Sequence, residues 1–301
     1  MNKVYNTVWN ESTGMWVVTS ELTRKGGRRP RQIRRTALAG LIAGLFLPSA
    51  PALAVDYNNE TLGSGATSSS MSLNAGDTAT DTTINSGGNQ YVSGGGSATS
   101  TTINSGGYQY VSSGGSATDT TINSGGSQYV SSGGSATDTT LNSGGYQYID
   151  DSASVTSTTI NSGGYQSVSS GGSATDTIIN SGGILGVSGG GTAVDITQNS
   201  GGAISADTSA ALSGTNINGS FSIANGSASN MLLENGGYLA VLNGHQATDT
   251  TINRGGNQYV SSGGSATSTT INNGGYQYVS SGGSATSTTI NNGGYQYVSS
   301  G

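Results

Sequence analysis

Apolar residues recur at a fixed interval of nineteen residues along most of the chain. One position of this period holds isoleucine or leucine, a second valine or isoleucine, and a third alanine or valine, with polar residues and glycine between them. Positions that exchange only among apolar residues are typical of a core. The second and third series begin at Val92 and Ala79. The first series comprises Ile84, Ile103, Ile122, Leu141, Ile160, Ile179, Ile252, Ile271 and Ile290.

Between these positions the pattern predicts short strands with one polar series inside. Gln109 lies two residues before Val111, so strand alternation places both side chains in the interior and leaves Tyr108 and Tyr110 outside. The glutamine recurs in most periods, and we expect its amides to stack into a ladder. A recurring asparagine, from Asn85 onward, predicts a second ladder of the kind found in stacked β-structures.

Corners must separate the strands. Ala98 and Ile103 are five residues apart, so both can face inward only if the chain turns between them. Paired glycines such as Gly106-Gly107 predict further corners, because glycine adopts positive φ without steric penalty. Gly, Ser, Thr and Asn are weak helix formers, which excludes a helical repeat. The sequence therefore predicts an all-β parallel β-solenoid with one coil per nineteen residues and about twelve coils.

Two stretches follow the period poorly. We expect residues 55–75 to cap the first coil and residues 76–301 to form the repeat. Within the repeat the pattern fades at 203–246, where we expect two irregular coils that produce a bend or an altered surface.

The first 54 residues are expected to be a signal peptide for export. A basic stretch, Gly26–Arg35, precedes the apolar run Ala37–Leu47. Eleven apolar residues are too few for a transmembrane helix, which needs about 20. The small residues Ala52 and Ala54 fit a signal-peptidase site, so we expect cleavage between Ala54 and Val55.

Charge divides the chain into two parts. Eight of nine basic residues precede residue 55, whereas thirteen acidic residues and one basic residue, Arg254, follow residue 54, for a formal charge of −12. Nucleic acid is therefore a poor partner for the repeat region, because phosphate binding needs basic groups. The chain has no cysteine, so disulfides cannot stabilise it.

The residue pattern argues against catalysis and against a metal or cofactor. The single histidine, His245, has no partner identifiable from the sequence, and we expect it in an exposed turn. Polysaccharide lyases also use parallel β-helices, but they need basic residues in a groove, and Arg254 is the only one here. Stacked aspartates could bind Ca²⁺, yet serines interrupt their series, so we expect solvated acids. These aspartates are Asp119, Asp138, Asp176 and Asp195.

Tyrosines are expected to form an exposed stripe along the rod. Strand alternation places their side chains outside, and an extended aromatic face suggests contact with another molecule. Rows of serine and threonine hydroxyls could add hydrogen bonds between two rods, which favours adhesion over ice binding or catalysis. The candidate adhesive residues are Tyr108, Tyr110, Tyr129, Tyr146, Tyr148, Tyr276 and Tyr278.

The leader and the repeated "INSGGxQxVSSGGSAT" resemble the AIDA/TibA-type self-associating autotransporter adhesins. The resemblance implies an extended signal peptide and a right-handed β-helical passenger. It also implies export through a C-terminal β-barrel to the surface of a Gram-negative cell. The sequence ends within a repeat, so we expect that barrel to lie outside it. Self-aggregation, biofilm formation and host-cell attachment are the implied activities, with neighbouring passengers and host surfaces as partners.

The same resemblance implies O-heptosylation of repeat serines by a cytoplasmic heptosyltransferase. The alternative is that these serines only satisfy turns. A structural stalk, or a glycosyltransferase substrate without adhesive activity, is the alternative function. The candidate acceptors are Ser86, Ser105, Ser113, Ser124, Ser132, Ser143, Ser162 and Ser181.

Overall fold

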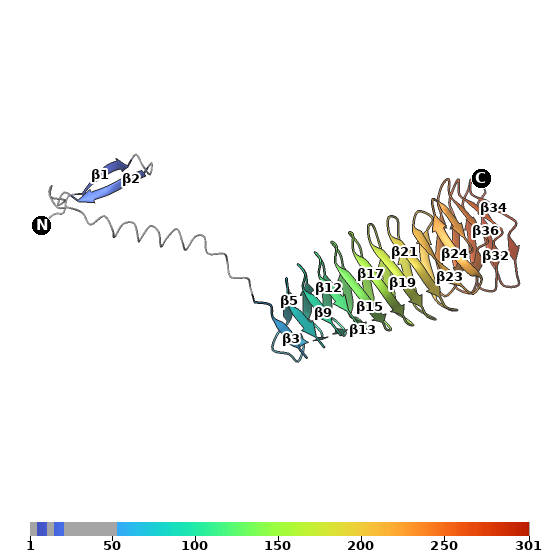
Figure 1. Cartoon of the computed structure of the whole chain (residues 1–301). Coiled ribbons are helices and arrows are strands. Elements are labelled where there is room, and N and C mark those ends of the chain that lie inside the picture. Colours follow the sequence, from blue (N-terminus) through green and yellow to red (C-terminus); the bar gives the residue numbers. More distant parts are fainter. Residues whose placement is uncertain (1–4, 11–14, 21–52, 301) are drawn as a thin grey trace. The chain divides into compact units, whose positions relative to one another are not determined.

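The computed structural model describes residues 5–10, 15–20 and 53–300 (Figure 1). The chain forms two compact units, Met1–Ala52 and Leu53–Gly301. In the first, β1 (Tyr5–Asn10) pairs antiparallel with β2 (Met15–Ser20). Most of the predicted signal peptide, including Ala52, lies outside the described residues. Among the described residues, no helix is long and apolar enough to cross a membrane.

The second unit is the predicted parallel β-solenoid of nineteen-residue coils. A representative coil contains β11 (Tyr108–Val111), β12 (Ser116–Thr118) and β13 (Thr121–Ile122). Each strand pairs in parallel with its counterpart one period away, so that Gln109 lies opposite Gln90 and Gln128. Identical residues therefore stack along the rod, which explains why the sequence repeats so strictly.

One face of the solenoid is a twelve-stranded parallel sheet with one four- or five-residue strand per coil. In chain order its strands are β5 (Ser70–Leu73), β8 (Asn89–Val92), β11, β14 (Ser127–Val130), β16 (Tyr146–Ile149), β18 (Tyr165–Val168), β20 (Ile184–Val187), β22 (Ala203–Asp207), β27 (Tyr238–Val241), β30 (Asn257–Val260), β33 (Tyr276–Val279) and β36 (Tyr295–Val298). One of these strands, β5, belongs to residues 55–75, so residues 76–301 supply eleven, one fewer than the twelve coils expected from the period.

The other two faces carry shorter strands that merge in the middle of the rod. The three-residue strands are β3 (Asp56–Asn58), β6 (Thr78–Thr80), β9 (Ser97–Thr99), β12, β25 (Ser227–Ser229), β28 (Gln246–Thr248), β31 (Ser265–Thr267) and β34 (Ser284–Thr286). The two-residue strands are β4 (Thr61–Leu62), β7 (Thr83–Ile84), β10 (Thr102–Ile103), β13, β26 (Leu232–Leu233), β29 (Thr251–Ile252), β32 (Thr270–Ile271) and β35 (Thr289–Ile290). The merged seven-residue strands are β15 (Ser135–Leu141), β17 (Ser154–Ile160), β19 (Ser173–Ile179) and β21 (Thr192–Gln198).

The interior contains the three predicted apolar series, except in the last described coil, where Ile290 and Val298 are exposed. It also contains the glutamine ladder, while the asparagine ladder runs at its edge. Ile103, Val111 and Ala117 are fully buried, as are their counterparts in neighbouring coils. Gln109 is also fully buried, and its Nε2 donates a hydrogen bond of 2.7 Å to Oε1 of Gln90. Asparagine side chains repeat the pattern in a partly buried row from Asn85 to Asn199. The core therefore combines apolar packing with hydrogen bonds between side-chain amides.

The predicted corner between Ala98 and Ile103 is a single residue in the left-handed region. Ser100 has φ 55°, and this brings the buried side chain of Thr101 into phase with the core. Residues in this series are Asp, Ser or Asn, whose short polar side chains tolerate left-handed backbone better than most. The same backbone occurs at Asp119, Asp138, Ser157, Asp176, Asp195, Asn230, Asp249, Ser268 and Ser287.

The two glycines of each pair are required for different reasons. Gly106 has φ +72°, which glycine adopts without penalty. Gly107 has no positive φ, but a Cβ there would lie 2.5 Å from the backbone oxygen of Ile84 in the preceding coil. The first glycine therefore serves the turn and the second allows the coils to approach.

Residues 55–75 form a coil of their own. Its strand β3 pairs with β6, and β5 pairs with β8, so the stack begins here. Asp56 lies opposite Thr78, twenty-two positions later, whereas Met71 lies opposite Gln90 at the usual nineteen. Three additional residues before β5 account for the poor match to the period.

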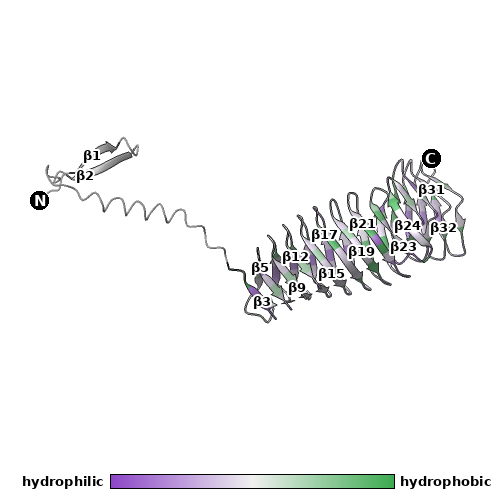
Figure 2. Ribbon diagram, in the orientation of Figure 1, coloured by the Kyte–Doolittle hydropathy of each residue, from purple (hydrophilic) through white to green (hydrophobic). Residues whose placement is uncertain are grey.

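The prediction of two irregular coils at 203–246 is wrong, because this stretch adds only one coil. Ser205 of β22 pairs directly with Tyr238 of β27. Between them, β23 (Ala211–Asn216), β24 (Gly219–Ala224) and β25 form an antiparallel excursion that continues the face of β21. Buried Phe221 and Ile223 anchor it to the core. Figure 2 shows strong hydrophobic colour at β24, in contrast to the polar strands elsewhere.

The excursion interrupts the asparagine ladder, whereas the glutamine ladder already ends at Gln166, where Leu185 follows. Gln198 occupies the isoleucine position, and its Nε2 donates to the backbone oxygens of Gly202 and Leu232 across the break. Its Oε1 is the one buried side-chain nitrogen or oxygen without a hydrogen bond among the described residues. Glu234 occupies the asparagine position, where its Oε2 accepts a 3.1 Å hydrogen bond from Asn253 and starts a second ladder.

Candidate functional site

Tyrosine side chains stack along the outer surface of the twelve-stranded sheet. Ring centroids of Tyr110 and Tyr129 lie 5.3 Å apart with an interplanar angle of 11°, and those of Tyr129 and Tyr148 lie 4.9 Å apart at 7°. Tyr146 is 40 % exposed. The first stripe, which we call the N-terminal stripe, comprises Tyr91, Tyr108, Tyr110, Tyr129, Tyr146, Tyr148 and Tyr165.

Stacking decides which part of each ring is available. Inside the stripe each ring face is covered by a neighbouring ring, so the edges and hydroxyl groups face solvent. Burial, followed by the neighbouring phenols Tyr91, Tyr129 and Tyr108, raises the pKa of Tyr110 above its usual range. The stripe therefore presents a regular row of phenolic hydroxyls.

A second stripe begins after the excursion and runs to the end of the described chain. Tyr259 and Tyr278 stack at 4.6 Å with an angle of 11°. The predicted adhesive residues Tyr276 and Tyr278 lie in this C-terminal stripe, and the others lie in the N-terminal stripe. The structure thus brings the seven tyrosines into two groups rather than one. The C-terminal stripe comprises Tyr238, Tyr259, Tyr276, Tyr278, Tyr295 and Tyr297.

All eight candidate acceptor serines are exposed, and they form two rows at coil corners. In the first row, Ser105 and its counterparts precede a glycine of positive φ. A Cβ at Gly125 would lie 2.8 Å from Oγ of Ser105, so the glycine leaves room for the hydroxyl of the preceding coil. The first row comprises Ser86, Ser105, Ser124, Ser143, Ser162 and Ser181, and the period extends it to Ser200, which is also exposed.

The second row lies at a different turn. Ser113 and Ser132 have φ of 49° and 46°, and the glycine after each also has positive φ, so these are type I′ turns. Ser132 donates a 2.8 Å hydrogen bond to Oδ2 of Asp151 one coil later. The same series contains the exposed Ser170, Ser262 and Ser281, which the period would also have identified.

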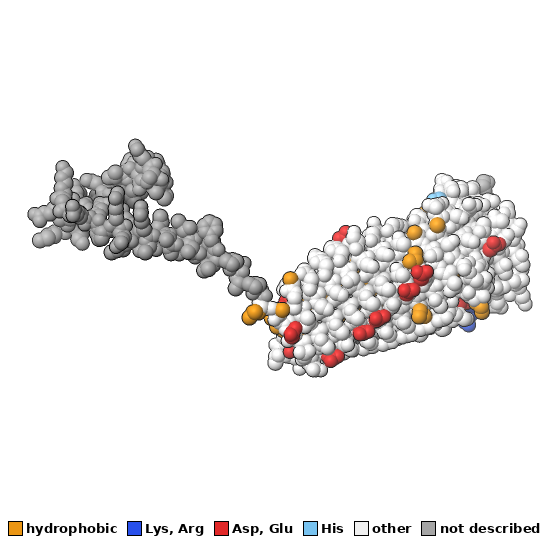
Figure 3. Space-filling model, viewed as in Figure 1, with side chains coloured by type: hydrophobic (Ala, Val, Ile, Leu, Met, Phe, Trp, Pro, Cys, Tyr) orange, Lys and Arg blue, Asp and Glu red, His pale blue; other side chains and the backbone are white. Residues whose placement is uncertain are grey.

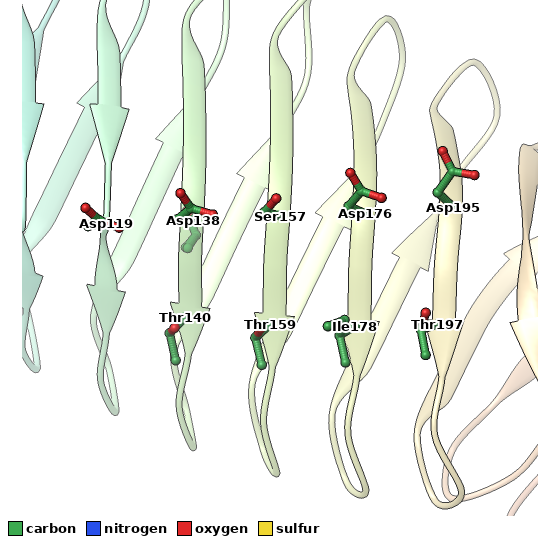
Figure 4. Close-up of a pocket in the computed structure, with 10 residues that line it drawn as sticks. Asp119, Asp138, Thr140, Ser157, Thr159, Asp176, Ile178, Asp195 and Thr197 are labelled. Atoms are coloured by element: carbon green, nitrogen blue, oxygen red, sulfur yellow. The ribbon is translucent and has the colours of Figure 1, made fainter.

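The aspartates considered for calcium lie in a row (Figure 4), with Asp138, Asp176 and Asp195 in β15, β19 and β21 and Asp119 between β12 and β13. Each is the left-handed corner residue of its coil, and Ser157 separates Asp138 from Asp176. Figure 3 shows acidic side chains scattered along the visible face of the rod. Within the described ranges, no group of three or more His, Cys, Asp or Glu could hold a metal ion. The left-handed backbone at this corner, which Asp tolerates better than most residues, accounts for the aspartates in this row.

His245 is not the exposed turn residue that the sequence suggested. It is partly buried, and its Nδ1 lies 2.8 Å from Oγ1 of Thr208, which is fully buried. A Cβ at Gly226 would lie 3.0 Å from the imidazole. The histidine therefore ties the excursion to the next coil, a contact across thirty-seven residues that the period does not predict.

Comparisons with known proteins place these features in a context. The family profile described as "Adhesin of bacterial autotransporter system, probable stalk" matches residues 65–107, 94–145, 107–164 and 213–275, more than half of the chain. The profile described as "Extended Signal Peptide of Type V secretion system" matches residues 1–50.

Two curated proteins and one solved structure are similar to the chain. It is 80 % identical over 247 residues to "Autotransporter CRAC" of Citrobacter rodentium (strain ICC168), which covers 82 % of the chain and 13 % of that protein. It is 78 % identical over 92 residues to "Autotransporter adhesin/invasin TibA" of Escherichia coli O78:H11 (strain H10407 / ETEC), covering 31 % of the chain and 9 % of TibA. The crystal structure of the TibC-catalysed hyper-glycosylated TibA55-350 fragment superposes with a TM-score of 0.56 at 48 % identity, covering 81 % of this chain and 97 % of that one. The chain therefore spans about an eighth of the length of the first relative and less of the second.

Proposed function

Because the chain belongs to the AIDA family of bacterial autotransporter adhesins and carries an extended signal peptide of type V secretion, we propose that it is the adhesive passenger segment of such a protein. It is an exported protein of the Gram-negative cell surface. We propose that it promotes self-aggregation, biofilm formation and attachment to host cells, without catalysis. Its partners in this proposal are passengers on neighbouring cells, host surfaces and the secretion machinery.

The observation that carries the proposal is the regular outer surface. Two rows of exposed corner serines and two tyrosine stripes repeat at the strand spacing of about 4.8 Å. Two rods laid side by side can therefore repeat the same contact in successive coils. Many weak contacts held on one rigid scaffold raise the total affinity far above that of one contact.

We further propose that the corner serines receive heptose from a cytoplasmic glycosyltransferase. The relative of known structure is a TibA fragment whose hyper-glycosylation TibC catalyses, and the chain aligns with 97 % of it. All eight candidate serines are exposed at turns, where a bulky substituent meets no core packing. A sugar on the first row would project from the corner beside the glycine of the next coil.

Intact mass and sedimentation test these proposals together. The exported chain, purified from its native host, should begin at Val55 and exceed its polypeptide mass by whole heptose increments. It should form dimers or larger species as its concentration rises. Unmodified material that still associates would locate adhesion in the bare tyrosine and hydroxyl surface and would contradict the glycosylation proposal. Unmodified, strictly monomeric material would contradict both.

A stalk is the second candidate function. The family description names a probable stalk, and the chain covers only 13 % of its relative CRAC. A continuous stack of twelve coils suits a spacer that holds another module away from the cell. A chain that is monomeric with and without sugar, and whose removal shortens the passenger without loss of binding, would favour this function.

A further inference from the structure

A hollow separates the two tyrosine stripes on the twelve-stranded sheet. Its walls include Tyr165 at one end and Tyr238 at the other, with Asp207 beside them. Its floor includes Ser205 and Ala240, and the hydroxyl of Tyr165 overlies Gly186, where a Cβ would lie 2.5 Å from it. These residues come from four successive strands, β18, β20, β22 and β27, so the hollow exists only in the assembled stack.

Small residues create the hollow where tyrosines stand in other coils. Along one line of paired residues, Tyr148 is followed by Ser167, Gly186 and Ser205 before Tyr238 restores an aromatic ring. Four strand steps separate Tyr148 from Tyr238, or about 19 Å. A register difference contributes, since Ser205 pairs with a tyrosine at the start of β27 rather than with Ala240. The hollow has a volume of about 420 Å³, which is within the range of small-ligand sites and suits one or two sugar rings.

The tyrosines at the two ends differ from those inside the stripes. Tyr165 is tilted by 51° to Tyr146, and Tyr238 is tilted by 37° to Tyr259. Each pairs with one other ring only among the described residues, whereas Tyr110 and Tyr129 are covered on both sides. Tyr165 and Tyr238 therefore retain a ring face that can pack against the C–H groups of a flat ligand.

Polar groups at the hollow suit hydroxyl-bearing ligands. Asp207 Oδ1 accepts a 2.7 Å hydrogen bond from the backbone N–H of Ser209, which holds the carboxylate in place. Its Oδ2 receives no hydrogen bond from residues 53–300 and can accept one from a sugar hydroxyl. Aromatic walls with a few oriented polar groups are the usual composition of a small-ligand site.

We propose that this hollow binds a neutral saccharide, one to two rings long, presented on a neighbouring cell surface. The sugar packs between Tyr165 and Tyr238 and donates a hydroxyl hydrogen bond to Asp207. The carboxylate and the net charge of −12 beyond residue 54 exclude sialylated and other anionic glycans. This recognition is independent of self-association and of sugars attached to the chain itself.

The test measures binding of residues 53–301, the compact unit, to albumin conjugates that carry mannose, galactose, glucose or heptose. A sialylated conjugate and bare albumin serve as comparisons, and multivalent conjugates compensate for weak single-site affinity. The main variant is Ser205→Tyr, which fills the hollow and joins the stripes. Its matched control, Asn89→Tyr, adds a tyrosine to the same sheet face beside Tyr108, away from the hollow. A second comparison removes a ring: Tyr238→Ala removes one wall of the hollow, and its control Tyr110→Ala removes a ring inside the N-terminal stripe.

We expect at least one neutral conjugate to bind, with a loss of tenfold or more in Ser205→Tyr and in Tyr238→Ala. Asp207→Asn should weaken binding several-fold, and both controls should remain within twofold of the natural chain. The proposal is overturned if no neutral conjugate binds above bare albumin, or if the sialylated conjugate binds as well. It is also overturned if Ser205→Tyr and Tyr238→Ala, folded by circular dichroism, bind like their controls.

Discussion

The side-chain amide of Gln109 donates a hydrogen bond of 2.7 Å to the amide oxygen of Gln90, one coil earlier in the stack. Gln128 and Gln147 continue the ladder in the same direction. Each of these glutamine amides also donates to the hydroxyl of a buried threonine: Gln109 to Thr101, and Gln128 to Thr120. A strand slipped by one residue would turn the glutamine outward and break every bond, so the ladder fixes the register.

A glutamine inside the ladder should matter more than one at its end. Gln128→Leu removes two ladder bonds, to Gln109 and from Gln147, whereas Gln166→Leu removes one because Leu185 follows it. Lost buried hydrogen bonds cost about 1 kcal/mol each. We expect the first variant to be less stable than the second by about that amount, measured by urea unfolding. Equal midpoints would contradict a cooperative ladder.

The first and the second glycine of a corner pair should respond differently to alanine, as Gly114 of one corner and Gly107 of another show. In Gly107→Ala the new Cβ meets the backbone oxygen of Ile84 at 2.5 Å, so two coils must separate. In Gly114→Ala the Cβ meets nothing within 4 Å, and only the positive φ is penalised, by about 1 kcal/mol. We expect a much lower melting temperature for the first variant. A larger effect of the second would show that turn strain outweighs coil contact.

Alkaline pH should weaken the tyrosine surface. Burial and neighbouring phenols raise the pKa of Tyr110 and of Tyr148 above 10, so the folded state keeps these protons longer than the unfolded chain does. Their contribution to stability is present below about pH 10, where unfolded tyrosine titrates, and is lost as pH rises further.

Denaturant midpoints between pH 8 and pH 11.5 should therefore fall above pH 10. The double variant Tyr110→Phe, Tyr148→Phe should show a smaller fall, because it lacks two of the phenols whose pKa is raised. An identical pH profile in the two proteins would exclude these groups as the cause.

Self-association should strengthen with salt. The region beyond residue 54 carries a formal charge of −12, so two rods repel each other. The screening length falls from about 30 Å at 0.01 M salt to about 8 Å at 0.15 M. Sedimentation velocity at a fixed protein concentration should show more dimer at the higher salt. Constant or decreasing association across this range would argue against side-by-side pairing of acidic faces.

The sequence by itself determined the coil. Ile103, Val111 and Gln109 could be placed inside, and Tyr110 outside, because a period of nineteen repeats every local choice about a dozen times. Because neighbouring coils are nearly identical, residues nineteen positions apart lie opposite each other, and the period alone predicts these contacts. The exposed corner serines followed from the same reasoning.

Only the tertiary structure decided what happens where the period fails. The stretch 203–246 is two coils by length but one coil and an antiparallel excursion by pairing, because its partners are not set by a repeat. The contact of His245 with Thr208 and the hollow between Tyr165 and Tyr238 depend on that pairing. Stacking also divided the tyrosines into two stripes, since whether a ring face is covered depends on the residue one coil away in space.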